Sequence, residues 1–268
     1  MESFYRTHKY LVEHVESPVK RDLMYQIDKN SRLVGIKGSR GVGKTTFLLQ
    51  YAKENYGLDR SCLYINLNNL YFTEHTLRDF ADHLPELKII FSGSSVMRLK
   101  EENPVLAGLV DSYNLRGFSF REYLNLMAST HFPSYSLSDI ITNHRAIAQE
   151  ICAQVNPLDY FPGYLHHGYY PFFLDKSNFS ENLVKNINMI MEVDILLIKQ
   201  IELSYLPKVR RLMYLLSVHS PAPTNVSQLS KDIQISRATV MNYIKSLKDA
   251  RLINMLYRVG EEFPKKPA

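Results

Sequence analysis

Residues 38–45 read Gly-Ser-Arg-Gly-Val-Gly-Lys-Thr, and this stretch decides the fold of the chain. It matches G-x-x-x-x-G-K-[ST], the pattern of a phosphate-binding loop (P-loop), at every fixed position. The apolar run at 32–37 predicts a buried strand before the loop, and residues 44–54 have apolar side chains at helical spacing after it. The sequence therefore predicts strand, loop and helix in the order that a P-loop requires.

Each loop position has a chemical reason. Glycines let the backbone curl so that N–H groups point at phosphate oxygens, and the helix start adds its positive dipole end. Lys44 is expected to reach the β and γ phosphates, Thr45 to ligate Mg²⁺, and Thr46 to contact the α phosphate. The expected nucleotide-binding residues are Gly38, Gly41, Val42, Gly43, Lys44, Thr45 and Thr46. The alternative is a glycine turn beside an exposed lysine, which the position of the match between strand and helix disfavours.

Apolar runs alternate with helical segments through the first half of the chain. Further strands are predicted over 61–67, 87–91 and 110–115, and further helices over 19–30, 73–84, 118–127, 138–155 and 180–205. This alternation predicts an α/β fold, here a P-loop NTPase with a three-layer α/β/α parallel sheet, followed by helical regions.

The C-terminal segment differs in charge and in pattern. Residues 206–268 hold 11 Lys+Arg against 4 Asp+Glu, whereas the other 205 residues hold 21 against 23. Helices are predicted over 207–219, 226–233 and 237–250, the last capped by Ser236, and a strand over 252–259. Three helices and a strand predict a winged helix-turn-helix.

The positive charge makes nucleic acid the first candidate partner of this segment. Candidate DNA contacts on the third helix and just after it are Arg237, Lys245, Lys248 and Arg251. The alternative is a packing and hinge module that never meets DNA; a protein partner is then the remaining candidate.

Composition narrows the class of protein. The chain has 268 residues, of which 45% are hydrophobic, enough for a real core. We expect no membrane segment, because no apolar stretch approaches about 20 residues, and no signal peptide, because residues 1–9 are polar. Cys62 and Cys152 are far apart, so we expect no disulfide framework and a cytoplasmic location. The pair His166-His167 has no partner at metal-site spacing and is interpreted as structural.

Four segments together carry a family resemblance. The P-loop strand, Tyr-Ile-Asn-Leu at 64–67, Ile-Ile-Phe-Ser-Gly-Ser-Ser at 89–95 and Ser-Phe-Arg-Glu-Tyr-Leu at 119–124 resemble one group of prokaryotic AAA+ ATPases. In that group an ATPase core precedes a winged helix and a restriction-nuclease-like domain. The resemblance implies ATP with Mg²⁺ as ligands. It also implies a core over 1–130, a helical lid over 131–205 and the winged helix over 206–268.

The resemblance implies roles near the γ phosphate. It places Ser94 or Ser95 at the sensor position, so that Lys44 and Ser94 become the candidate catalytic residues. The alternative for these serines is a helix cap or turn.

Three departures from the family weigh on hydrolysis. The family's strand ending in Asp-Glu (Walker B) is missing, because no carboxylate between residues 73 and 86 follows an apolar run. The family's arginine pair is also missing, since the matching stretch at 106–110 has no arginine. The chain ends about where the nuclease-like domain would begin. Since hydrolysis needs an oriented water and neutralised charge, we expect ATP binding with weak or no turnover. A DNA-binding regulator with a vestigial P-loop, or a fragment of a longer active ATPase, are the alternatives.

Overall fold

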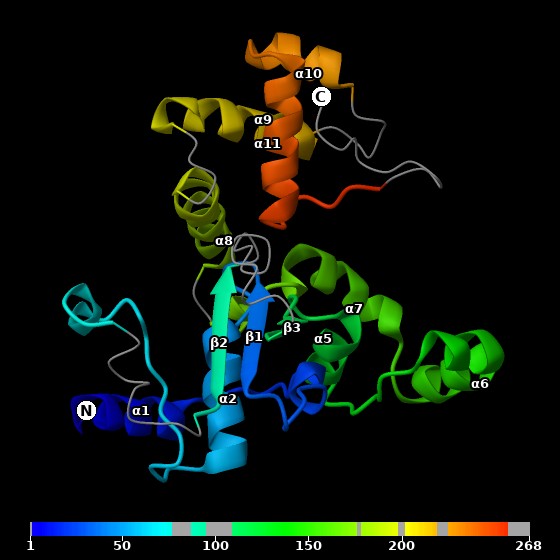
Figure 1. The fold of residues 1–268 in the computed structure, drawn as a ribbon. Coiled ribbons are helices and arrows are strands. Elements are labelled where there is room, and N and C mark those ends of the chain that lie inside the picture. The colour runs from blue at the N-terminus through cyan, green and yellow to red at the C-terminus, as the bar shows by residue number, and fades with distance from the viewer. Residues whose placement is uncertain are drawn as a thin grey trace. The chain divides into compact units, whose positions relative to one another are not determined.

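The computed structural model describes residues 2–76, 87–94, 109–175, 178–197, 202–218 and 225–256. The chain divides into two compact units (Figure 1). Unit 1 comprises residues 1–93 and 99–179, and unit 2 comprises residues 94–98 and 180–268. The main division after residue 179 falls inside the range 131–205, where the sequence predicts a helical lid.

Unit 1 contains a three-stranded parallel sheet in the order β2-β1-β3. The strands are β1 (Leu33–Gly38), β2 (Ile89–Ser94, whose last residue is assigned to unit 2) and β3 (Asp111–Asn114). In the pairing of β1 with β3, Val34 lies opposite Asp111 and Lys37 opposite Asn114. The α/β fold with a parallel sheet is thus confirmed, with three of its four predicted strands.

Helices of several kinds complete unit 1. In the described part of unit 1, the α-helices are α1 (Glu2–His14), α2 (Lys44–Tyr56), α5 (Phe120–Met127), α6 (Leu137–Gln154) and α7 (Pro157–Gly163). The shorter elements are the 3₁₀ helices η1 (Asp22–Tyr25), η2 (Leu70–Thr73) and η5 (Pro171–Leu174) and the π-helix η4 (Tyr164–Gly168).

The core of unit 1 joins β1 to α2. Val34 and Ile36 are fully buried on β1, and Phe47 of α2 packs against them in the same cluster. Leu115, just after β3, belongs to this cluster as well. Burying such side chains stabilises the unit by about 1.5–3 kcal/mol each, and fixes β1 and α2 on either side of the P-loop.

The predicted strand over 61–67 is wrong. Residues 62–66 have no sheet pairing. This segment packs against helix α1 instead of a neighbouring strand. The Tyr64 backbone N–H donates to His8 Nδ1 at 3.0 Å, and Cys62 packs with Val12 and Leu49. Helix α1 itself was not predicted from the sequence.

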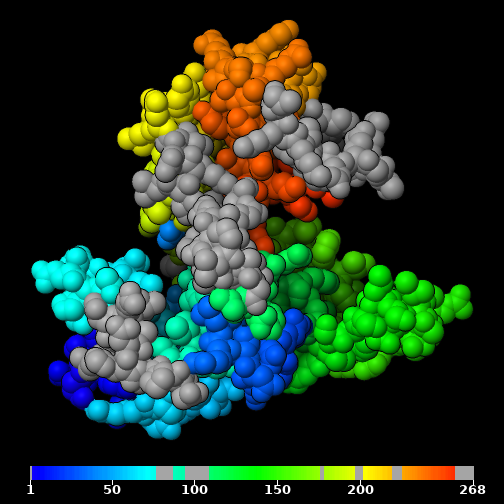
Figure 2. All heavy atoms as spheres, in the orientation of Figure 1, coloured from blue at the N-terminus to red at the C-terminus, as the bar shows by residue number. Residues whose placement is uncertain are grey.

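One further helix prediction in unit 1 needs correction, and another is mostly untested. The helix predicted over 19–30 is reduced to the single turn η1, although Leu23 and Ile27 are buried as its apolar spacing suggests. The helix predicted over 73–84 lies mostly outside the described residues, and residues 70–73 form the turn η2. Helix α6 matches its prediction, has no buried residue and extends away from the rest of unit 1 (Figure 2).

Unit 2 is helical in its described part. It contains α8 (Phe179–Met189, which begins at the last residue of unit 1), the π-helix η6 (Ile190–Leu197), η7 (Leu203–Tyr205), α9 (Leu206–Val218), α10 (Val226–Ile233) and α11 (Arg237–Asp249). The three last helices confirm their predicted ranges to within one residue. They share a core that includes Leu212, Val240 and Leu247, all fully buried.

Helices α10 and α11 form a helix-turn-helix. Gln234 ends α10 in the left-handed conformation (φ 59°), where glycine is more common. Ser236 then caps α11 by accepting a hydrogen bond from the Thr239 N–H at 3.1 Å. Residues 252–256 do not form the predicted wing strand, and residues 257–259 lie outside the described ranges. The structure therefore supports a helical C-terminal region, without a wing among its described residues.

Candidate nucleotide site at the P-loop

The P-loop lies between the end of β1 at Gly38 and the start of α2 at Lys44. Gly41 and Gly43 have positive φ values of 83° and 85°, a conformation that costs glycine little and other residues more. At Gly38 an added Cβ would lie 2.5 Å from the Leu115 carbonyl oxygen. These three glycines are therefore required by the backbone path, and the glycine pattern is more than a flexible turn.

Lys44 is held at the loop by two backbone contacts. Its Nζ donates to the carbonyl oxygens of Gly38 and Ser39, each at 2.9 Å. The Phe47 N–H donates to the Gly43 carbonyl at 2.9 Å, so helical hydrogen bonding begins directly after the loop. The ammonium, the first N–H groups of α2 and the positive end of its dipole thus gather at one place.

The remaining loop residues divide into buried and accessible ones. Val42 is fully buried in the core cluster, which anchors the middle of the loop. Thr45 is exposed and Thr46 half-buried in the first turn of α2. Ser39 is 2% exposed, and its hydroxyl has no hydrogen-bond partner within the described residues. Thr45 is therefore accessible to a cation, as its predicted role requires.

A buried ion pair lies beneath the loop. Arg21 Nε donates to Glu122 Oε1 at 2.9 Å, and both side chains are only 9% exposed. The Arg21 guanidinium also donates to the carbonyl oxygens of Val42 (3.3 Å), Arg116 (2.6 Å) and Gly117 (3.1 Å). Removing one partner of such a pair costs about 3–5 kcal/mol, because the other charge stays buried.

Glu122 has a second set of partners at the start of α5. Its Oε2 accepts hydrogen bonds from the Ser119 N–H and hydroxyl, both at 2.9 Å, which completes a capping box. Burial alone would raise the pKa of Glu122, but the Arg21 charge and the Ser119 hydrogen bonds outweigh it and hold the pKa below its ordinary value. Glu122 is therefore ionised at neutral pH and keeps its charge opposite Arg21.

The segment Tyr169–Pro171, which contains two tyrosines, lies close to Gly43 of the P-loop and to Gly117 in the loop after β3. The Phe118 N–H donates to the Tyr169 carbonyl at 2.8 Å, and Gly117 has no room for a side chain because Tyr169 lies against it. Pro171 lies close enough that its Cγ would be 3.7 Å from a Cβ at Gly43. Burial, with a smaller contribution from Tyr169, raises the pKa of Tyr170 to about 12, so its hydroxyl stays neutral.

The sensor and acidic positions are only partly described. Ser94 is the last residue of β2, the strand next to β1 in the sheet. Ser95, Asp79 and Asp82 lie outside the described residues, as does most of the stretch 73–86 in which the family pattern would place a Walker B segment. Within the described ranges, no group of three or more His, Cys, Asp or Glu side chains could hold a metal ion.

The loop fits a nucleotide phosphate with Mg²⁺. Its left-handed glycines, a backbone path that a Cβ would obstruct, and the ammonium beside a helix start are the features that a phosphate requires. Thr45 would supply the protein ligand of Mg²⁺. Sequence reasoning missed Arg21, and it missed the role of Glu122 although Ser119-x-x-Glu122 is a visible capping-box signal.

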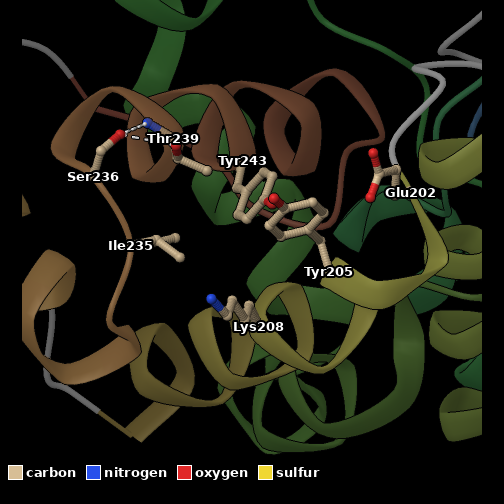
Figure 3. Close-up of a pocket in the computed structure, with 7 residues that line it drawn as sticks. All are labelled: Glu202, Tyr205, Lys208, Ile235, Ser236, Thr239 and Tyr243. Carbon is tan, nitrogen blue, oxygen red and sulfur yellow. Dashed lines mark hydrogen bonds between the residues drawn. The ribbon is translucent and has the colours of Figure 1, made fainter.

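Unit 2 has a separate concave site of about 500 Å³ (Figure 3). It is lined by Glu202, Tyr205, Lys208, Ile235, Ser236, Thr239 and Tyr243. Ser236 and Thr239 belong to the start of α11, and the rings of Tyr205 and Tyr243 point toward one another.

The candidate DNA contacts lie on α11 or just after it. Arg237 and Lys245 are exposed, whereas Lys248 and Arg251 are half-buried. Arg251 follows the helix with a positive φ of 60°. Two of the four basic side chains are therefore exposed to solvent.

Comparisons with known proteins agree with the P-loop. Residues 30–79 match the family described as AAA domain, and residues 158–267 match the family described as Domain of unknown function (DUF8612). The chain is 25% identical to an uncharacterized protein of Methanocaldococcus jannaschii, over 90% of this chain and 60% of that protein. The chain thus spans about 60% of the length of this curated relative. No solved structure matches it.

The AAA match covers β1, the P-loop and α2, so it agrees with nucleotide binding. Across the described residues, the helices are too short or too polar to cross a membrane.

Proposed function

We propose that this protein binds ATP with Mg²⁺ as an AAA+-type protein with weak or no hydrolysis, and couples the bound state to its C-terminal helical module. The observation that carries the proposal is the P-loop itself, with Lys44 Nζ held 2.9 Å from two loop carbonyls at the start of α2. In this proposal the core spans 1–130, the lid 131–205 and the coupled module 206–268. The cytoplasm is the proposed location.

The residues of the loop have distinct roles in binding. The backbone of Gly41–Gly43 and the start of α2 bind phosphate oxygens, Lys44 neutralises the β and γ phosphates, and Thr46 contacts the α phosphate. Mg²⁺ held by Thr45 supplies further neutralisation of phosphate charge. The preference for adenine rests on the family resemblance alone.

Weak turnover follows from what the sequence lacks. Ser94 is the proposed sensor, but the acidic pair that orients water and the arginine that stabilises the transition state in the family are not found in this sequence. An arginine of this kind contributes about 10³–10⁵ to the rate.

Phosphate release from saturating Mg-ATP, followed over hours, tests this part of the proposal. We expect a rate at or below about 10⁻³ s⁻¹, the range of a P-loop protein without its arginine finger. Steady release near 1 s⁻¹ would contradict weak turnover while leaving ATP binding intact.

A second candidate function, DNA binding by unit 2, is favoured by the helix-turn-helix geometry of α10 and α11. Arg237 and Lys245 are exposed on α11, as phosphate contacts require. Titrating a short duplex at several salt concentrations tests it. Since each lost phosphate contact lowers the salt slope by about 0.9, neutralising Lys245 and Lys248 should weaken binding and reduce the slope by about 2. An unchanged affinity and slope would remove α11 as the contact surface.

A further inference from the structure

Arg21 joins two loops that follow neighbouring strands of the sheet. Its guanidinium donates to Val42 in the P-loop after β1, and to Arg116 and Gly117 in the loop after β3. Four of its hydrogen bonds are accounted for by Glu122 and these three carbonyls. Arginine suits this position because its five N–H donors have a fixed planar arrangement.

Glu122 in turn fixes the orientation of Arg21. One carboxylate oxygen accepts from Arg21 Nε, and the other accepts from Ser119 at the start of α5. The Phe118 ring lies 4.9 Å from the guanidinium carbon and covers its face. Because the pair is buried and hydrogen-bonded on both sides, it has one well-defined geometry.

The contact with Val42 has a consequence for phosphate binding. A trans peptide is planar, and its C=O and N–H point in opposite directions. The described residues contain no cis peptide, so the Gly43 N–H points away from Arg21 when the Val42 carbonyl points toward it. Gly43 is one of the loop residues whose N–H groups are expected to bind phosphate.

We infer that the Arg21–Glu122 pair is a positioning element of the nucleotide site. It orients the Val42–Gly43 peptide so that the Gly43 N–H faces the phosphate, and it thereby sets phosphate affinity without touching the ligand. The inference rests on the proposed function, because it concerns the same loop.

The test combines two variants of the pair with a site-specific signal. The sequence contains three Val-Gly pairs, at 34–35, 42–43 and 259–260. Labelling valine carbonyls with ¹³C and glycine nitrogens with ¹⁵N therefore isolates three amide signals in a ¹³C-edited spectrum. The Gly35 and Gly260 signals serve as internal references for the Gly43 signal.

We expect Arg21→Lys and Glu122→Gln to shift the Gly43 signal without ligand and to leave the two reference signals in place. Both variants should weaken binding of Mg-ATP and of inorganic tripolyphosphate by the same factor, about ten-fold. Arg21→Lys replaces the planar guanidinium that bonds the Val42 carbonyl, and Glu122→Gln removes the charge that orients this guanidinium. The control is Arg60→Lys. Arg60 forms an exposed ion pair with Glu2, and this pair has no role in the proposed nucleotide site. It should change neither the signal nor the affinity.

A purely structural role predicts a different result. The melting temperature would fall while the Gly43 signal and both affinities stayed as in the unaltered chain, and this outcome would overturn the inference. If the unaltered chain does not bind ATP, the proposed function is refuted. The shift of the Gly43 signal that the variants cause without ligand would still report on the Arg21 contact.

A measurement on the unaltered chain covers the case in which both variants unfold. Tripolyphosphate should move the Gly43 amide signal and the Arg21 Nη1–H signal together, because Nη1 donates to the Val42 carbonyl of the same peptide. A change at Gly43 with an unmoved Arg21 signal would overturn the inference.

Discussion

Replacing Lys44 with alanine is expected to lower the affinity for Mg-ATP by about 100-fold or more and to leave the fold intact. Lys44 contributes its positive charge and its hydrogen bonds directly to the phosphates, and each charged hydrogen bond is worth about 1.5–3 kcal/mol. Its side chain is only half-buried and its two bonds go to backbone carbonyls, so the cost to stability is small. Calorimetric titration measures the affinity, and thermal unfolding measures the fold.

Lys53→Ala is the matched control for this change. Lys53 belongs to the same helix α2, and its Nζ also donates to two backbone carbonyls, those of Glu13 and Val15. The two variants therefore remove the same charge and similar bonds at different places. Equal affinities for ATP in both would show that phosphate binding does not depend on the P-loop lysine.

Replacing Leu247 with alanine is expected to destabilise unit 2 by about 2–5 kcal/mol. Leu247 is fully buried where α11 packs against α9 and α10, so its removal loses apolar burial and leaves a cavity. Denaturant unfolding followed by circular dichroism measures the loss. The effect is large because unit 2 depends on one core cluster shared by short helices.

Leu256→Ala provides the comparison, because Leu256 is 92% exposed and the substitution removes the same atoms. Its expected effect is within about 0.5 kcal/mol. Similar losses for both variants would mean that Leu247 does not lie in the core of the helix-turn-helix.

The parts of the fold that the sequence predicts correctly are those with a local cause. The P-loop is recognisable because phosphate binding requires particular residue types at fixed spacing. The backbone requires glycine at Gly41 and Gly43 because of their positive φ, and at Gly38 because a Cβ would meet the Leu115 carbonyl. Helices α10 and α11 are predicted because their apolar residues repeat at helical spacing and Ser236 supplies a cap.

The parts that fail depend on distant residues. The run at 61–67 has the composition of a strand, but the Tyr64 N–H bonds His8 of α1 instead of a neighbouring strand. Strand propensity reports burial on one face and does not show which partner provides it. The same reason hides the Arg21–Glu122 pair, because 101 residues separate its members and Arg21 has no local signal.

The candidate site shows the same division. The phosphate-binding residues follow from the motif, whereas the residues that orient the loop, Arg21 and Glu122, are visible only in the structure. The sensor position illustrates the limit, since a serine after an apolar strand fits both a sensor and a turn. The sensor role of Ser94, at the end of β2, therefore stays a prediction.

Calorimetric titration of the unaltered chain with Mg-ATP is the measurement that tests the central claim most directly. The account predicts saturable binding with one site per chain, a dissociation constant in the micromolar range, and competition by inorganic tripolyphosphate because the loop binds phosphates. An absence of binding up to millimolar Mg-ATP by a chain shown to be folded would contradict the account. The P-loop would then be a glycine turn beside a lysine, and the DNA-binding candidate would be the function to pursue.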